Sequence, residues 1–284
     1  MTRDGRLPEL LAPAGSPEAL RAAVEGGADA VYFGASGFNA RAGARNFSDT
    51  ELRRAVEFCH GRGVRVYLTL NTLIYDRELR DYLAAAETAY LAGVDALIVA
   101  DIGGAAALRR TFPDLPLHAS TQMSGHSVGC AKELASLGFE RMVLAREMSF
   151  ADIAGFTRTS PIEAEVFIHG ALCVCHSGQC LFSSMVGGRS GNRGECAQPC
   201  RLPYNGGKYP LSLKDNCLAG HIPELIDAHV ASLKIEGRMK GPDYVGPVTA
   251  VYRRLLDGHR AATPEEIGYL AEIFSRSGFT DAYF

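Results

Sequence analysis

Cysteines are the residues in this sequence best suited to chemistry, and most of them lie in one stretch. Five of the eight fall within EVFIHGALCVCHSGQCLFSSMVGGRSGNRGECAQPCR, residues 165–201, where Gly, Ser, Asn and Arg fill the gaps between them. Thiols used only as small core residues would not gather in this way. Thiolates are soft ligands for zinc or iron–sulfur clusters, so the stretch predicts a metal cage. The predicted ligands are Cys173, Cys180, Cys196 and Cys200.

The spacing of these four cysteines, C-x6-C-x15-C-x3-C, narrows the choice of metal only in part. Zinc ribbons prefer paired C-x2–4-C knuckles, which only the second pair approaches, and ferredoxin-type clusters use tighter spacing. Zinc and an iron–sulfur cluster therefore both stay open on spacing alone. Cys175 is expected beside the cage rather than in it. The isolated Cys59, Cys130 and Cys217 are expected to be structural thiols.

The composition is that of an ordinary globular protein. The chain has 284 residues, 47% of them hydrophobic and 21% charged, which is enough to bury a sizeable core. No apolar run reaches the ~18 residues of a membrane span, and the opening residues, MTRDGRLPELLAPAG, lack the apolar centre of a signal peptide. We therefore expect a cytoplasmic protein with reduced thiols and no membrane partner, which favours metal ligation over disulfides.

The charge of the chain is unevenly spread. The formal net charge is −3, which argues against a general binder of polyanions. Between residues 187 and 240, however, eight Lys and Arg stand against five acids, a local excess of +3. A basic rim beside the predicted cage would suit a phosphate or carboxylate substrate, and a solvated surface would account for the same excess.

The elements that must position these residues follow a repeated pattern. GADAVYF, GVRVYLT, GVDALIV and GFERMVL each place a Gly before a β-rich apolar run, after residues with helical spacing. Gly suits a helix C-terminus, and a continuous apolar strand suits a sheet that is covered on both faces. HVASLKI repeats the form with His in place of Gly, and with the other apolar runs the sequence predicts eight strands, at residues 9–14, 30–34, 65–70, 96–100, 115–120, 141–145, 165–169 and 232–236.

Eight βα units in this length predict a (β/α)8 TIM-like barrel, with a cysteine-rich insertion after the seventh strand. An open doubly wound sheet is the alternative, but no GxGxxG follows the first strand.

The barrel is expected over residues 1–240, with its insertion at 173–230 and a short strand at 209–215. Closing helices are expected over 241–284, at 242–256 and 264–274, and the final GFTDAYF is expected to lead into a further region. Ser48 to Glu51 and Ser149 to Asp152 predict helix-starting capping boxes.

The predicted strand ends carry an unusual share of polar side chains. In a barrel these positions face the active-site mouth. Candidates for proton transfer are His118, Glu147, His169 and Glu236. Candidates for substrate binding at the strand ends are Asn71, Gln122, Arg146, Lys234 and Arg238. Three readings without a functional role stay open: a Lys234–Glu236 ion pair inside the barrel, a local Arg146–Glu147 pair, and a hydrogen-bonded core position for His118.

Nucleophilic catalysis is a second chemical possibility. Cys173 lies four residues after His169, and a Cys–His pair could supply a thiolate nucleophile. No HExxH zinc-protease motif occurs in the sequence. A lone thiolate nucleophile would not need three more cysteines nearby, so a thiol peptidase is the less favoured hypothesis.

Four motifs give the chain a family resemblance. ELLAPAGSPEAL, GADAVYFG, EVFIHGALC with SGQC, and SLKIEGRMK are similar to peptidase family U32, the collagenase-like proteases, and most resemble its branch of bacterial RNA hydroxylation proteins. The resemblance implies a [4Fe–4S] cluster and oxygen-independent hydroxylation of an rRNA or tRNA base, with prephenate as the hydroxyl donor. It also implies that Cys173, Cys180, Cys196 and Cys200 bind the cluster, with Cys200 in the place that the RNA branch uses.

The resemblance suggests roles for the basic residues as well. Arg146, Lys234 and Arg238 would hold a small dicarboxylate, because forked guanidinium groups suit carboxylates. Arg189, Arg193 and Arg201 would meet RNA phosphates. Two alternatives remain: a U32-type peptidase acting on proteins, and a non-catalytic, metal-stabilised domain that binds RNA or another partner. The sequence indicates no oligomeric state.

Overall fold

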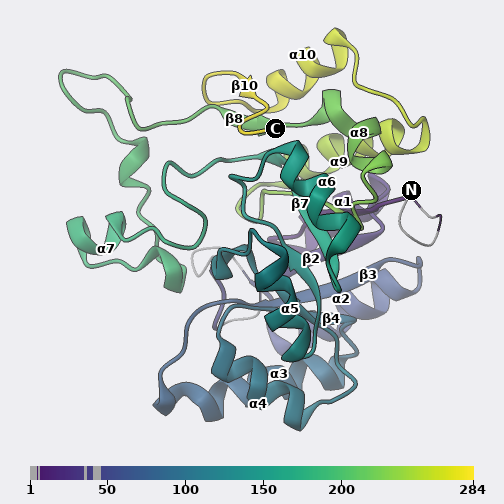
Figure 1. Cartoon of the computed structure of the whole chain (residues 1–284), viewed down its shortest axis with the longest axis vertical. Coiled ribbons are helices and arrows are strands. Elements are labelled where there is room, and N and C mark those ends of the chain that lie inside the picture. The colour runs from purple at the N-terminus through teal and green to yellow at the C-terminus, as the bar shows by residue number, and fades with distance from the viewer. Residues whose placement is uncertain (1–4, 6, 35–36, 41–45) are drawn as a thin grey trace.

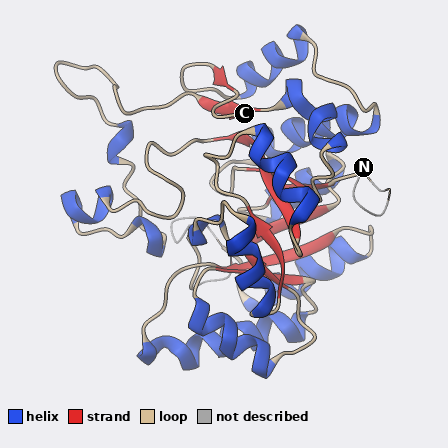
Figure 2. Ribbon diagram, viewed as in Figure 1, coloured by secondary structure: helices blue, strands red, loops and turns tan. Residues whose placement is uncertain are grey.

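Eight parallel strands close into a barrel, surrounded by helices (Figures 1 and 2). The computed structural model describes residues 5, 7–34, 37–40 and 46–284. The first strand, β1, pairs with both β2 and β9, and β7 also pairs with β9, which completes the ring. The ring runs through β1 Glu9–Pro13, β2 Ala30–Gly34, β3 Arg65–Leu70, β4 Ala96–Val99, β5 Leu117–Ala119, β6 Phe139–Val143, β7 Glu163–Gly170 and β9 Ser232–Ile235.

The barrel prediction is confirmed, and all eight strands lie within two residues of their predicted bounds at either end. The helices around them begin at good start signals. Ser48 and Glu51 form a reciprocal capping box at the start of α2. Ser149 accepts the Asp152 backbone N–H at the start of α6, without the reciprocal backbone contact. The outer helices of the βα units are α1 Pro17–Glu25, α2 Asp49–His60, α3 Leu79–Ala92, α4 Ile102–Thr111, α5 Val128–Ser136, α6 Phe150–Thr159 and α8 Ile222–Asp227.

The predicted closing helices are α9 Pro242–Asp257 and α10 Pro264–Ile273. The longer one, α9, packs closely beside α1 and buries a full stripe of side chains, including Tyr244 and Tyr252. Pro242 begins α9 at a position where its missing N–H has no helical partner to lose. This packing covers the outside of β1, where the ring closes.

Residues 171–214 form the irregular segment that we call the cysteine insertion. It extends to one side of the barrel and carries α7 Phe182–Gly187 (Figure 1). The strand expected at 209–215 is misplaced: residues 209–212 form a turn, and the strand is β8 Asp215–Cys217. That strand forms because it has partners, the antiparallel end of β7 and the parallel β10 Phe279–Thr280. Residues 209–214 have none among the strands of the described chain.

The interior of the barrel is partly ionic. Buried Glu9 lies 2.6 Å from Arg141, and the same guanidinium lies 3.4 Å from Glu165. Tyr67 donates to the other oxygen of Glu9 at 2.7 Å. Because each buried charge has an opposite partner, the network avoids the large cost of an isolated interior ion. It fills the lower end of the barrel and leaves the carboxyl ends of the strands for a site.

Candidate metal and substrate site

The carboxyl ends of the barrel strands open into a cavity of about 380 Å³. Its floor is made by strand ends, and its outer wall by the cysteine insertion together with residues that follow β9 and α10. This is the face on which barrel enzymes place their chemistry. Nearly all residues singled out by type and position in the sequence therefore meet around one space.

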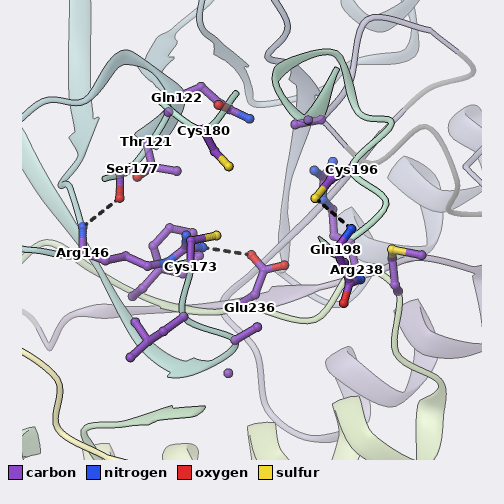
Figure 3. A pocket seen from close by; sticks show the side chains of 18 of the residues that line it. Thr121, Gln122, Arg146, Cys173, Ser177, Cys180, Cys196, Gln198, Glu236 and Arg238 are labelled. Carbon is purple, nitrogen blue, oxygen red and sulfur yellow. Dashed lines mark hydrogen bonds and ion pairs between the residues drawn. The ribbon is translucent and has the colours of Figure 1, made fainter. Parts of the chain in front are cut away.

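All four predicted ligand cysteines, and Cys175 as well, line this cavity. Cys173 and Cys180 lie on the segment that leaves β7, and Cys196 lies on the returning segment beyond α7; their side chains reach into the same space (Figure 3). Cys200 sits in the short 3-10 helix Pro199–Arg201. Cys173 and Cys196 are exposed, whereas the other three thiols of the group are half-buried.

Polar contacts with the barrel fix the first cysteine segment. The Ser177 backbone N–H and hydroxyl both donate to Glu147, at 3.1 and 3.2 Å, and the Ser124 hydroxyl donates to the Ser177 carbonyl at 2.6 Å. Gly178 has a φ of +76°, and a Cβ there would lie 2.3 Å from the Gln122 carbonyl oxygen. Only glycine fits this turn, which sets the course of the chain between Cys173 and Cys180.

The second cysteine segment is held mostly by contacts within the insertion. The Ala197 backbone N–H donates to the Ser183 hydroxyl at 2.9 Å, and Arg189 donates to the Glu195 carbonyl at 3.0 Å. Arg201 donates to the carbonyls of Leu213 and Leu172 at 2.7 and 2.5 Å. Since backbone carbonyls hold Arg201 and no ion pair to it is found among the described residues, its positive charge remains available to the neighbouring thiols.

The thiols share one electrostatic environment. Burial raises the pKa of Cys200; Arg201 opposes that shift, while Cys173, Cys196 and Cys180 add to it. Within the described residues, however, no group of three or more His, Cys, Asp or Glu converges closely enough to hold a single metal ion.

Arg146, Lys234 and Arg238 form what we call the cationic floor of the cavity. Arg238 donates to the Thr69 hydroxyl at 2.6 Å, and Arg146 lies 3.4 Å from Glu236 and 4.1 Å from the centre of the Phe167 ring. These buried or half-buried contacts hold each guanidinium in place. A small anion entering the cavity would meet three cations whose positions are already set.

The partner of Lys234 differs from the predicted one. Its Nζ lies 2.7 Å from Glu165, inside the barrel, while Glu236 pairs with Arg146 beyond the end of β9. Strand alternation directs Lys234 and Glu236 to the same side of β9. The long side chain of Lys234, however, reaches down to the fully buried carboxylate of Glu165 on β7. Burial lowers the pKa of Lys234, and Glu165 opposes that shift. The predicted Lys234–Glu236 pair is therefore wrong, and so is the local Arg146–Glu147 pair.

Two of the four proton-transfer candidates lie at the cavity. Glu236 and His169 both line it, on neighbouring strands. His169 is 1% exposed, and burial lowers the pKa of its ring to about 3. No hydrogen bond in the described part of the chain joins His169 to Cys173, so the Cys–His pair of a thiol peptidase does not form here.

The other two candidates lie away from the cavity lining. His118 is buried inside the barrel with its ring 4.8 Å from that of Tyr67, and burial holds its pKa well below the usual value. Its Nδ1 has no hydrogen-bond partner within the described structure. Glu147 binds Ser177 and so positions the first cysteine segment. Their places favour structural roles over contact with substrate.

The remaining predicted binding residues divide in the same way. Asn71, Gln122 and Arg189 line the cavity, although the Asn71 side chain is already bonded to the Ala40 N–H and the Ser120 hydroxyl, at 3.0 and 3.1 Å. Arg193 lies outside the lining, because it donates to both oxygens of Glu78, at 3.2 and 2.7 Å. It ties the insertion to the residues between β3 and α3.

Several lining residues were not anticipated from the sequence. Tyr32 and Phe167 are strand residues whose rings flank Lys234, at 4.3 and 5.4 Å from Nζ to the ring centres. Period-two alternation along β2 and β7 could have indicated that they face the interior. Arg276 and Asp215 form an ion pair in the outer wall. No local signal marks these two, because β10 and β8 bring them together from distant parts of the chain.

The sequence also contains GHSVG at residues 125–129, which matches the GxSxG of serine hydrolases. In the structure Ser127 is the N-cap of α5, with extended backbone at φ −142°. Its hydroxyl accepts the Cys130 N–H at 3.2 Å. It lacks the strained elbow of a hydrolase nucleophile and lies outside the cavity lining.

Fold and cavity together define a (β/α)8 barrel protein whose strand-end site is covered by a cysteine insertion. The model of peptidase family U32 matches residues 15–284, and the chain belongs to that family. A solved structure described as the U32 peptidase Mk0906 superimposes with a TM-score of 0.57, at 15% identity, over 85% of this chain and 97% of that one. The likeness supports the barrel fold.

Two curated relatives are named for RNA modification. The chain is 43% identical to the 23S rRNA 5-hydroxycytidine C2501 synthase of Escherichia coli strain K12, over all of this chain and 44% of that protein. It is 39% identical to the tRNA hydroxylation protein P1 of Bacillus subtilis strain 168, over 91% of this chain and 65% of that protein. The chain thus spans less than two thirds of the length of both. Among the helices of the described residues, none is long and apolar enough to cross a bilayer.

Proposed function

We propose that this chain takes part in iron–sulfur-dependent, oxygen-independent hydroxylation of a base in rRNA or tRNA, with prephenate as the hydroxyl donor. The observation that carries the proposal is that four thiols and the cationic floor line the same cavity. The names of the two RNA-modifying relatives supply the substrate class. The thiols and cations alone would fit other redox chemistry equally well.

The chemistry sets what the cavity must hold. Replacing a ring C–H by C–OH removes two electrons from the base and adds one oxygen, so without O₂ the donor must deliver that oxygen and carry the two electrons away. Cys173, Cys180, Cys196 and Cys200 would hold a [4Fe–4S] cluster, which when bound supplies redox or Lewis-acid chemistry. A zinc ion would supply only the second, so zinc is the less suitable metal.

The protein's own residues would bind and orient the substrates. Arg146, Lys234 and Arg238 would hold the carboxylates of the donor, because fixed cations stabilise an anion without having to reorganise. Glu236, which lines the cavity and pairs with Arg146, would receive or return a proton. Arg189, at the outer edge of the cavity, would meet a phosphate of the RNA. The insertion and the strand ends together would shield the reacting atoms from water.

Two measurements test the proposal. Protein purified without oxygen should contain four iron and about four sulfide per chain, and a colourless, zinc-loaded protein would contradict the cluster. Mass spectrometry of rRNA and tRNA from a deletion strain should show one nucleoside lighter by a single oxygen, restored by the wild-type gene. Unchanged RNA masses would contradict an RNA substrate.

The family name supports one alternative, a peptidase. Proteolysis of a gelatin substrate that survives iron removal and disappears in Cys173→Ser would favour it. A non-catalytic binding domain is the other alternative. It would show RNA binding that Arg238→Gln leaves intact, together with unchanged RNA masses in the deletion strain.

A further inference from the structure

A buried hydrogen-bond chain connects His169 to the layer between the barrel and α9. His169 lies at the end of β7 and is one of the residues that line the cavity. Its Nδ1 lies 3.2 Å from the hydroxyl of Tyr252, a fully buried residue of α9. Cys217 of β8 approaches the same hydroxyl, with its Sγ at 3.7 Å. Three elements of the fold therefore meet at one phenol oxygen.

The positions of the protons follow from counting donors and acceptors. The Tyr252 hydroxyl has one proton, which it donates to the Ile168 carbonyl at 3.0 Å. Its oxygen can then accept two hydrogen bonds, one from the Cys217 thiol and one from a proton on Nδ1 of His169. All three contacts are satisfied in this arrangement. If Tyr252 donated to His169 instead, the Ile168 contact would lose its proton, and the buried group would make one bond fewer.

We propose that Tyr252 holds His169 as the neutral tautomer protonated on Nδ1, so that Nε2 presents a lone pair to the cavity and accepts a hydrogen bond from an O–H or N–H group of the bound ligand. No partner of Nε2 is found among the described residues. Burial, which lowers the pKa of the ring to about 3, agrees with a neutral imidazole. With a neutral ring and an unprotonated Nε2, His169 accepts a hydrogen bond at Nε2 and does not donate a proton from it.

This role differs from that of the three cations on the cavity floor. Arg146, Lys234 and Arg238 can only donate, and they bind the acceptor atoms of a ligand. An acceptor beside these cations makes the site more selective, because the ligand must then carry a hydrogen-bond donor at the place that Nε2 of His169 faces. A site that hydrogen-bonds a substrate hydroxyl or amine strongly rejects analogues that lack it. Tyr252 is then a positioning residue that never touches the ligand.

Neutron diffraction from perdeuterated crystals of the holoprotein tests the tautomer directly and independently of the reaction. We expect deuterium on Nδ1 of His169 and none on Nε2. Deuterium on Nε2, alone or together with Nδ1, would overturn the proposal. The matched variants are Tyr252→Phe, which keeps the ring, and Cys217→Ala, which removes the weaker contact. In Tyr252→Phe, deuterium should appear at least in part on Nε2 of His169. In Cys217→Ala, it should stay on Nδ1. If the deuterium on His169 is unchanged in Tyr252→Phe, Tyr252 does not set the tautomer.

A pair of His169 variants tests the acceptor role and rests on the proposed function. A Gln side chain can place its amide oxygen where Nε2 lies, whereas Asn reaches only the position of Nδ1. With RNA hydroxylation in a complemented deletion strain as the readout, His169→Gln should stay within about tenfold of the wild type, and His169→Asn should fall further. Equal loss in both would contradict a pure acceptor. If the wild type itself modifies no RNA, the proposed function fails, and the neutron result still decides the tautomer.

Discussion

The cationic floor and the cysteine insertion face each other across one cavity but are built on opposite principles. On the floor, each cation has a fixed partner: Lys234 has Glu165, Arg238 has Thr69, and Arg146 has Glu236. The insertion has one six-residue helix and short 3-10 turns over more than forty residues, and its thiols are exposed or half-buried. The floor is ordered by side chains of the barrel, whereas the insertion is held by hydrogen bonds between irregular segments.

The difference indicates how the site is assembled. Side chains held by buried partners on regular strands are ready before any ligand arrives. Metal binding and folding are coupled in irregular segments that ligate a metal. If the proposed cluster binds here, its loading would shape the outer wall, whereas the floor would be the same with or without it.

The largest expected effect separates the four proposed ligand cysteines from Cys175. Cys180→Ser should lose the cluster iron and all RNA hydroxylation, because the cluster needs every one of its thiolates. Cys175→Ser is the matched control, a half-buried thiol of the same cavity, and should keep both. Iron analysis and visible absorbance measure the difference. Loss of iron in Cys175→Ser with retention in Cys180→Ser would exchange their assignments.

The same variant tests whether the metal orders only one of the two regions. Limited proteolysis of Cys180→Ser should cut within residues 171–214 much faster than in the holoprotein, and leave the barrel fragments uncut. Cuts spread over the barrel strands would show that the floor, too, depends on the cluster.

The next effect concerns the floor alone. Glu165→Gln removes the charge partner of buried Lys234 and one partner of Arg141, so it should lower the free energy of unfolding by about 3–5 kcal/mol. Glu163→Gln is the control, since it pairs with the same Arg141 from an exposed position and should cost about 0–1 kcal/mol. Urea denaturation gives both values. An equal loss of unfolding free energy in Glu165→Gln and Glu163→Gln would mean that burial of the Lys234–Glu165 pair does not add to the cost of breaking it.

A smaller effect appears in the pH dependence of stability. His169 has a pKa of about 3 in the folded protein and about 6.5 in the unfolded chain. Between these values the unfolded state binds the extra proton, so stability is complete above about pH 6.5 and falls as the pH falls. The slope from this one group is about 1.4 kcal/mol per pH unit, or about 2 kcal/mol between pH 7 and 5. His169→Gln should remove that part of the slope in urea titrations, and an unchanged slope would contradict the buried neutral ring.

The sequence predicts the barrel better than it predicts the contacts at the site. Each strand is marked locally by a short apolar run, preceded by Gly in four of the eight, and the residue after a parallel strand must lie at the mouth. Pairings such as Lys234 with Glu165 depend instead on how β7 and β9 meet when the ring closes, over sixty residues apart in the chain. No sequence motif near Lys234 indicates that its side chain turns into the barrel while Glu236 pairs with Arg146.

The insertion shows the same limit in another form. Its cysteines are evident from type and spacing, and the structure places all of them on the cavity. Which of its arginines face the cavity depends on how the loop folds back over the barrel. Arg193 reaches Glu78 before α3, and that contact can be seen only once the barrel is formed.

The smallest expected effect uses those two arginines as a matched pair. Arg189 lines the cavity, and Arg193 is held by Glu78 with its side chain 32% exposed. If RNA phosphates meet the outer wall, Arg189→Gln should weaken RNA binding and reduce the slope of log affinity against log salt by about 0.7–0.9. Arg193→Gln should leave the slope unchanged and cost at most about 1 kcal/mol of stability. A reduced slope in Arg193→Gln alone would place the RNA over the β3–α3 side of the barrel instead, and would move the substrate entrance away from the thiols.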